Sequence, residues 1–121
     1  MEEKDVKAFC KMVAKVLELK RVVDLLDNPK LFVVRTDTNR LALCAEFINK
    51  NDVLIRYIVR IKNGKAIIYN NLFSGSNPFK PTVVDIYEKT TSPSNVANFF
   101  KKELKDFKEK INKTNKIDTV Q

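Results

Sequence analysis

Apolar residues recur every three or four positions from Lys4 to Leu26, which is the period of a helix with one apolar face. We therefore expect an amphipathic helix at the amino terminus whose core-facing residues are Val6, Phe9, Cys10, Val13, Val16 and Leu17. The pattern then blurs through "LKRVVDLLDNP", so residues 18–28 fit either further helix or a short strand. Asn28-Pro29 ends either element, because a residue before proline disfavours the helical conformation.

The next part of the chain consists of β-rich runs separated by short polar turns. The runs are "KLFVVRT" at 30–36, "RLALCAEFI" at 40–48 and a long segment that begins at Val53. We expect a turn at Thr38-Asn39, a loop at 49–51 and a type I′ hairpin turn at Asn63-Gly64, whose residues both accept a positive φ. The pattern predicts an antiparallel meander of about four strands.

Strict alternation divides this predicted sheet into two faces, because the side chains of a strand point to opposite sides in turn. The hairpin turn at Asn63-Gly64 places Ile58 opposite Tyr69. One face is apolar and must be covered by helices; it holds Phe32, Val34, Leu41, Leu43, Ala45, Phe47, Val53, Ile55, Tyr57, Val59, Ile61, Ala66, Ile68 and Leu72. The reverse face is amphipathic and basic; it holds Leu31, Val33, Arg35, Cys44, Glu46, Arg56, Ile58, Arg60, Lys62, Lys65, Ile67 and Tyr69.

After the hairpin, "SGSNPFKP" has the composition of a loop, and residues 82–89 fit either a strand or a short helix. The final helix is signalled by Ser92 as its N-cap and Pro93 in its first turn. Its apolar side chains recur at helical spacing at Val96, Phe99, Phe100, Leu104, Phe107 and Ile111. We therefore expect an α+β fold in which an amino-terminal and a carboxy-terminal helix cover one face of the meander.

Composition fits one domain, which we place at residues 1–116 with a frayed tail at 117–121. The chain is 44% hydrophobic and 31% charged, and no apolar run approaches the roughly 20 residues that span a bilayer. The amino terminus "MEEKDVKAF" is charged where a signal peptide would be apolar. We expect an intracellular protein, nuclear or cytoplasmic, that does not bind a membrane.

The residue types present argue against an enzyme. The chain has no histidine and only two glycines, so histidine-based catalysis and a glycine-rich phosphate loop are excluded. Cys10 and Cys44 lie far apart, which supports no metal site, and we expect both to be buried apolar residues. Glu46 lies beside Arg56 in the predicted sheet, where an ion pair is its expected role. We expect no catalytic residues, no metal and no cofactor.

Residues 65–111, "KAIIYNNLFSGSNPFKPTVVDIYEKTTSPSNVANFFKKELKDFKEKI", resemble the carboxy-terminal half of RWD-like heads in kinetochore proteins of the outer-kinetochore or monopolin type. The features that carry the resemblance are a hairpin strand before a proline loop, an apolar pair before a threonine and a helix with sheet-facing apolar residues. They are Pro78, Val83 and Ile86 before Thr90, and Phe99, Leu104 and Phe107. The resemblance implies an RWD-like fold and a dimeric interaction module in kinetochore assembly.

A second resemblance is to the paired Alu-RNA-binding subunits of the signal recognition particle, which present a basic sheet face to RNA. The formal net charge of +8 makes an acidic partner plausible in either case. Apolar residues on the reverse face favour a protein partner, in a homodimer or a heterodimer, and nucleic acid is the alternative. The predicted partner-binding residues are Leu31, Val33, Arg35, Arg56, Ile58, Arg60, Lys62, Lys65, Ile67 and Tyr69.

Overall fold

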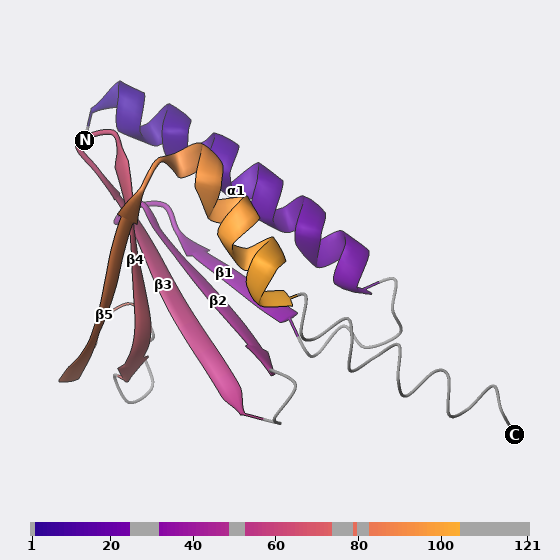
Figure 1. The fold of residues 1–121 in the computed structure, drawn as a ribbon. Helices are drawn as coiled ribbons and strands as arrows, with labels where there is room; N and C mark the ends of the chain where they lie inside the picture. The colour runs from indigo at the N-terminus through magenta and orange to yellow at the C-terminus, as the bar shows by residue number, and fades with distance from the viewer. Residues whose placement is uncertain (1, 25–31, 49–52, 74–78, 80–82, 105–121) are drawn as a thin grey trace, which may run out of the picture.

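The computed structural model describes residues 2–24, 32–48, 53–73, 79 and 83–104 of the chain. The described elements are α1 (Glu3–Asp24), β1 (Phe32–Asp37), β2 (Ala42–Ile48), β3 (Leu54–Lys62), β4 (Lys65–Phe73), β5 (Val83–Thr91), the 3-10 turn η2 (Pro93–Asn95) and a helix over residues 96–104 (Figure 1). The α+β prediction is confirmed, with five strands in place of four. The difference arises because residues 83–91, which the sequence left open between strand and helix, form β5.

The five strands form one antiparallel meander in the order β1-β2-β3-β4-β5. The predicted hairpin is confirmed, since Asn63 has φ 53° and Gly64 has φ 75°, as a type I′ turn requires. The hairpin fixes the register, with Lys62 opposite Lys65 and Ile58 opposite Tyr69. Both helices lie on the same side of the sheet, and the opposite face carries neither of them (Figure 1).

The turn between β1 and β2 is longer than predicted. The expected two-residue turn at Thr38-Asn39 is a four-residue turn over 38–41, and Asp37 pairs with Ala42. The carboxylate of Asp37 explains the difference, because it accepts the Asn39 N–H at 3.1 Å and pairs with Arg40 at 3.5 Å. The extra length is two residues, so every side chain keeps its predicted face. The predicted loop at 49–51 lies outside the described residues.

The main core lies between the two helices and the predicted apolar face of the sheet. At its centre the ring of Tyr57 stacks on that of Phe47, with 5.9 Å between the ring centroids. Tyr57 also packs edge-to-face with Phe99 and Phe100, at centroid distances of 5.1 and 5.7 Å. Its buried residues are Phe9, Met12, Val16, Val23, Phe32, Leu41, Leu43, Ala45, Phe47, Tyr57, Val59, Ile61, Ala66, Ile68, Val96, Phe100 and Leu104. The predicted face is therefore confirmed for these strand residues, whereas Val53 is 50% exposed.

The two helices differ in detail from their predictions. Ser92 holds the N-cap position, but its hydroxyl lies 3.1 Å from that of Ser94 and does not cap the backbone, and the first turn is 3-10. Phe107 and Ile111 lie outside the described residues. Residues 18–24 belong to α1, which settles part of the open segment 18–28 in favour of helix. The remainder of that segment is not described.

The apolar stripe predicted for the first helix is rotated in the structure. Phe9 and Val16 are buried as expected, but Cys10 and Leu17 are exposed, and Met12 and Val23 take their place in the core. The physical reason lies at the start of α1. The carboxylate of Asp5, only 8% exposed, accepts the Gly64 N–H at 2.7 Å and so turns its own side of the helix toward the sheet. The prediction that Cys10 is buried is wrong, and the one for Cys44 is confirmed.

Candidate functional site

The candidate site is the face of the sheet that carries no helix, which we call the open face. The predicted site residues Arg35, Lys62 and Lys65 are exposed there. Those that are half-buried are Val33, Arg56, Arg60, Ile67 and Tyr69. Leu31 lies outside the described residues. The register brings the described members together on four adjacent strands, β1 to β4.

Ile58 does not lie on the surface of the open face, contrary to its predicted place in the site. It is 0% exposed and forms a small second core with Cys44, against which Tyr69 and Phe79 pack. Phe79 lies in sequence between β4 and β5, so this one residue provides intrachain cover for the centre of the open face. The sequence signal for this role was a single phenylalanine in a proline-bearing loop, and we did not assign it.

A single carboxylate holds two of the predicted arginines. Glu46 accepts contacts from Arg35 at 3.0 Å and from Arg56 at 3.3 Å, so the predicted Glu46–Arg56 pair is confirmed and extended to β1. The Glu46 side chain is 12% exposed and that of Arg56 is 21% exposed, so solvent screens this contact only in part. The buried Nε of Arg56 has no hydrogen-bond partner among the described residues.

The third arginine of the open face also makes an internal contact. Arg60 donates from Nη2 to the backbone carbonyl of Phe79 at 2.9 Å, which ties Phe79 to β3. Lys62 and Lys65 face each other at the end of the hairpin and are exposed. The three arginines therefore have partners within the chain, and the two lysines are exposed beside them.

The buried thiol of Cys44, next to Glu46 on the same face, is unreactive at neutral pH. Burial, followed by the nearby Glu46 carboxylate, raises the pKa of the Cys44 thiol from 9.0 to about 11. The thiol is therefore protonated at neutral pH, and a protonated thiol is neither a good nucleophile nor a metal ligand. Among the described residues no group of three or more Cys, Asp or Glu side chains is placed to hold a metal ion.

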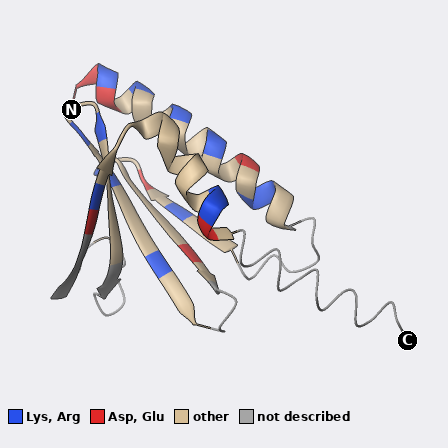
Figure 2. Cartoon of the chain, viewed as in Figure 1, with Lys and Arg blue, Asp and Glu red and all other residues tan. Residues whose placement is uncertain are grey.

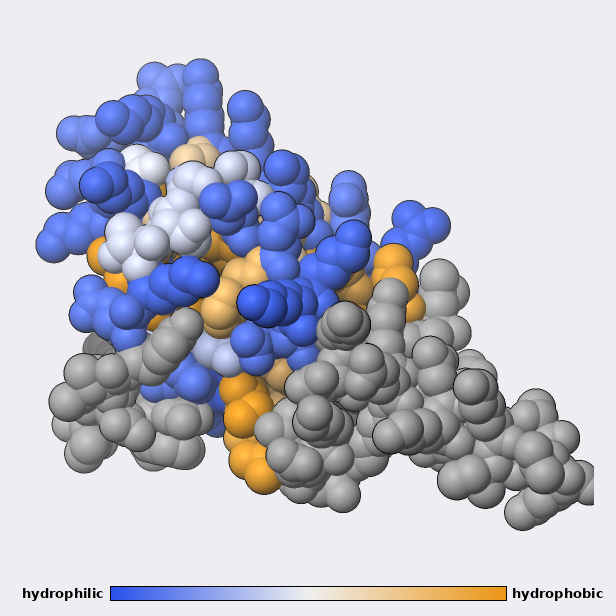
Figure 3. Space-filling view, viewed as in Figure 1, coloured by the Kyte–Doolittle hydropathy of each residue, from blue (hydrophilic) through white to orange (hydrophobic). Residues whose placement is uncertain are grey.

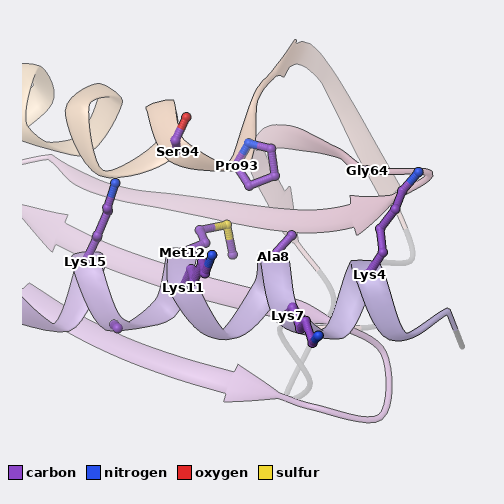
Figure 4. Close-up of a pocket in the computed structure, with 10 residues that line it drawn as sticks. Lys4, Lys7, Ala8, Lys11, Met12, Lys15, Gly64, Pro93 and Ser94 are labelled. Atoms are coloured by element: carbon purple, nitrogen blue, oxygen red, sulfur yellow. The ribbon is translucent and has the colours of Figure 1, made fainter.

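A second feature lies on the helical side of the molecule, and sequence reasoning missed it. A groove of about 700 Å³ runs between α1 and the Pro93-Ser94 turn. Ala8, Met12 and Pro93 contribute its apolar lining (Figure 4). The lysines that line it are Lys4, Lys7, Lys11 and Lys15. Their three- and four-residue spacing places them on one side of the helix, which was the available signal.

The lysines of this groove differ in their pairing. Lys7 lies 3.6 Å from Glu3, whereas Lys4, Lys11 and Lys15 form no ion pair with any residue in the described part of the chain. Lys4 reaches toward the hairpin turn at Gly64 (Figure 4). Basic residues recur along α1 in Figure 2, and Figure 3 shows a largely hydrophilic surface over the two helices. The groove therefore offers the ammonium groups of Lys4, Lys11 and Lys15 to an anionic ligand.

None of the helices that the structure describes has the length and apolar character needed to cross a membrane. Comparison with known proteins gives no relative for the chain: no family model, no curated protein and no solved structure matches it. The resemblance to RWD-like kinetochore heads therefore stays a prediction from residues 65–111.

Proposed function

We propose that this protein is a non-catalytic protein-interaction module that docks an acidic protein partner through its open face. The observation that supports this most is the mixture on one surface of half-buried Ile67 and Tyr69 with the Arg35–Glu46–Arg56 cluster. Apolar and aromatic side chains beside arginine are the composition favoured at protein interfaces. Kinetochore assembly in the nucleus is the setting that the resemblance implies.

The internal contacts of the arginines favour a protein partner over nucleic acid on this face. A phosphate would have to compete with Glu46 for Arg35 and Arg56, and with the Phe79 carbonyl for Arg60. Protein β-sheets that bind single-stranded nucleic acid also present several aromatic side chains on which the bases stack. Here Tyr69 and Phe79 pack against the Cys44–Ile58 core, which uses at least part of each ring.

Charge favours an acidic partner over a second copy of the same face. By register, basic side chains outnumber acidic ones there; the basic ones are Arg35, Arg56, Arg60, Lys62 and Lys65, and the acidic ones are Asp37, Glu46 and Glu88. Two such faces repel each other, whereas an acidic surface is complementary. The dimerisation predicted from the sequence therefore needs a different surface.

The test places a photo-crosslinking amino acid at position 67 or 69 in the full chain, with position 22 on α1 as the control. We expect protein crosslinks from the open face that survive nuclease treatment. The captured partner is then purified and titrated against Ile67→Asp, which should weaken binding at least about tenfold because it buries a charge at the interface. Crosslinks to nucleic acid alone, or unchanged affinity of a folded Ile67→Asp variant, would overturn the proposal.

Ile58→Asp is unsuitable for this test, although Ile58 was a predicted site residue. Its side chain is fully buried within the chain, so an aspartate there would destabilise the fold itself. Ile67 is half-buried on the same face and one strand away, directly opposite Arg60. A change at Ile67 therefore reports on binding more cleanly.

A second candidate function, polyanion binding, is favoured by the lysine groove. Lys4, Lys11 and Lys15 line the groove without an ion pair in the described part of the chain. If single-stranded nucleic acid binds there, replacing all three by glutamine should reduce the salt slope of log K by about 2. Lys62→Gln with Lys65→Gln is the control, and an effect confined to that control would move nucleic-acid binding to the open face.

A further inference from the structure

An exposed apolar stripe runs along α1 beside its buried face. Val6 is 36% exposed, Leu17 is 46% exposed, Cys10 is exposed and Val13 is half-buried. The spacing between these four residues is four, three and four, which places them in one line on a helix. This is the spacing of the apolar seam through which two helices pack together. Val13 also packs against the main core, so the exposed members of the line are Val6, Cys10 and Leu17.

The stripe points away from the helix over residues 96–104. The opposite side of α1 faces that helix, because Lys15, Leu19 and Val22 line a groove there together with Ala97 and Lys101. At about 100° per residue, Val6 and Leu17 lie roughly half a turn round from that groove. None of the stripe residues lines either groove. The stripe is therefore a separate surface, on the side of α1 away from the second helix.

Charges of opposite sign flank the stripe near its two ends, although Glu3 also pairs with Lys7 of its own helix at 3.6 Å and α1 ends at Asp24. Glu2 and Glu3 lie at the amino-terminal end, and Lys20 and Arg21 lie at the carboxy-terminal end. If a second α1 is laid antiparallel, Glu3 of one copy comes next to Arg21 of the other, and Val6 comes next to Leu17. Cys10 then lies near Val13 of the second copy. The pattern is thus complementary to itself about a two-fold axis near the middle of the helix.

We propose that two copies of this protein form a two-fold dimer in which α1 packs antiparallel on α1 through Val6, Cys10, Val13 and Leu17. A parallel arrangement would set Glu3 against Glu3 and Arg21 against Arg21, which is unfavourable. This inference goes beyond the proposed docking function, because it uses α1 and leaves the open face free for its partner. Either can fail without the other.

The first test measures the mass of the full chain in solution by analytical ultracentrifugation over a concentration series. We expect a species of twice the 14.0 kDa chain mass. Leu17→Asp should raise the dissociation constant at least about tenfold. Val22→Asp is the matched control, because Val22 is equally exposed at 46% on the same helix but lines the groove. A monomer at every concentration, or equal effects of the two substitutions, would overturn the proposal.

The second test reads the orientation of the helices. Glu3→Lys and Arg21→Glu should each weaken the dimer, and the double variant should restore it, because the antiparallel pair is then re-formed with its charges exchanged. Failure of the double variant to recover affinity would contradict the antiparallel arrangement. A short bis-maleimide should also join the two copies through Cys10, and Cys10→Ala should abolish the product, since Cys44 is buried.

Discussion

The two faces of the sheet both bury apolar residues completely, but they do so with different materials. On the face of the sheet that the two helices cover, which we call the helical face, Ile68 lies in a continuous apolar core. On the open face, Ile58 is equally buried, yet among the described residues its apolar neighbours are Cys44, Tyr69 and Phe79. The charged Glu46–Arg56 pair lies on the same face. Burial alone therefore does not identify a core. Whether a buried residue can become exposed depends on the element that covers it, which is a pair of packed helices on one face and Phe79 on the other.

The largest expected effect is the difference in unfolding free energy lost when a buried isoleucine on each face is replaced by alanine. Ile68→Ala should lower the free energy of unfolding by about 4 kcal/mol, because the rigid helical layer cannot collapse into the cavity. Ile58→Ala should cost about 2 kcal/mol, since Phe79 and the long arginine side chains can relax into the space. Urea unfolding followed by circular dichroism measures both. Equal losses would show that the cover of the open face is as rigid as the helices.

The next effect concerns the carboxylate that holds the cover together. Glu46→Gln should lower the free energy of unfolding by about 2 to 3 kcal/mol, because it leaves Arg35 and Arg56 beside each other without an anion. The loss stays at the lower end because Arg35 is half-exposed. Glu88→Gln is the control on the same face, where Glu88 is exposed opposite Tyr69. A loss at position 88 as large as that at position 46 would contradict a special role for the cluster.

The helical face could be predicted almost completely from the sequence, and the reason is local. Asn63-Gly64 fixes one hairpin register, and alternation then assigns every neighbouring strand. An error of two residues in the β1–β2 turn did no harm, because the side-chain period of a strand is also two. The rotation of α1 was not predictable in this way, since it depends on the contact between Asp5 and Gly64, which are 59 positions apart.

The site could be predicted only in part, for a related reason. Alternation placed Arg35, Arg56 and Arg60 on one face correctly and predicted the Glu46–Arg56 pair. It did not show that Glu46 also pairs with Arg35, or that the carbonyl of Phe79 accepts from Arg60. Nor does it show that Phe79 covers Ile58, because a loop has no period that fixes its position. Tertiary contacts of irregular segments decide which predicted surface residues reach the solvent.

The buried thiol of Cys44, on the open face, should make the free energy of unfolding depend on pH in the alkaline range. The folded state raises the pKa of Cys44 from 9.0 to about 11, so the stabilisation from its bound proton is complete below pH 9 and is lost as the pH rises through 11. We expect wild type to lose ~2 kcal/mol more than Cys44→Ala between these values. Parallel declines of wild type and Cys44→Ala would refute the assignment.

The smallest of these effects tests what holds the helical cover in its rotated position. Asp5→Ala removes the acceptor for the Gly64 N–H and should cost about 1 kcal/mol of unfolding free energy. Asp5→Asn keeps a carbonyl oxygen in the same place and should lose about half as much, because its hydrogen bond lacks the charge. Because the contact sets the rotation of α1, Asp5→Ala should slow the reaction of a maleimide with Cys10, whose exposure follows from that rotation. The rate is measured on monomeric protein, below the dissociation constant of the proposed dimer, which would cover Cys10. An unchanged labelling rate together with lost stability would mean that the sheet packing alone fixes the helix, and that Asp5 only strengthens a position already chosen.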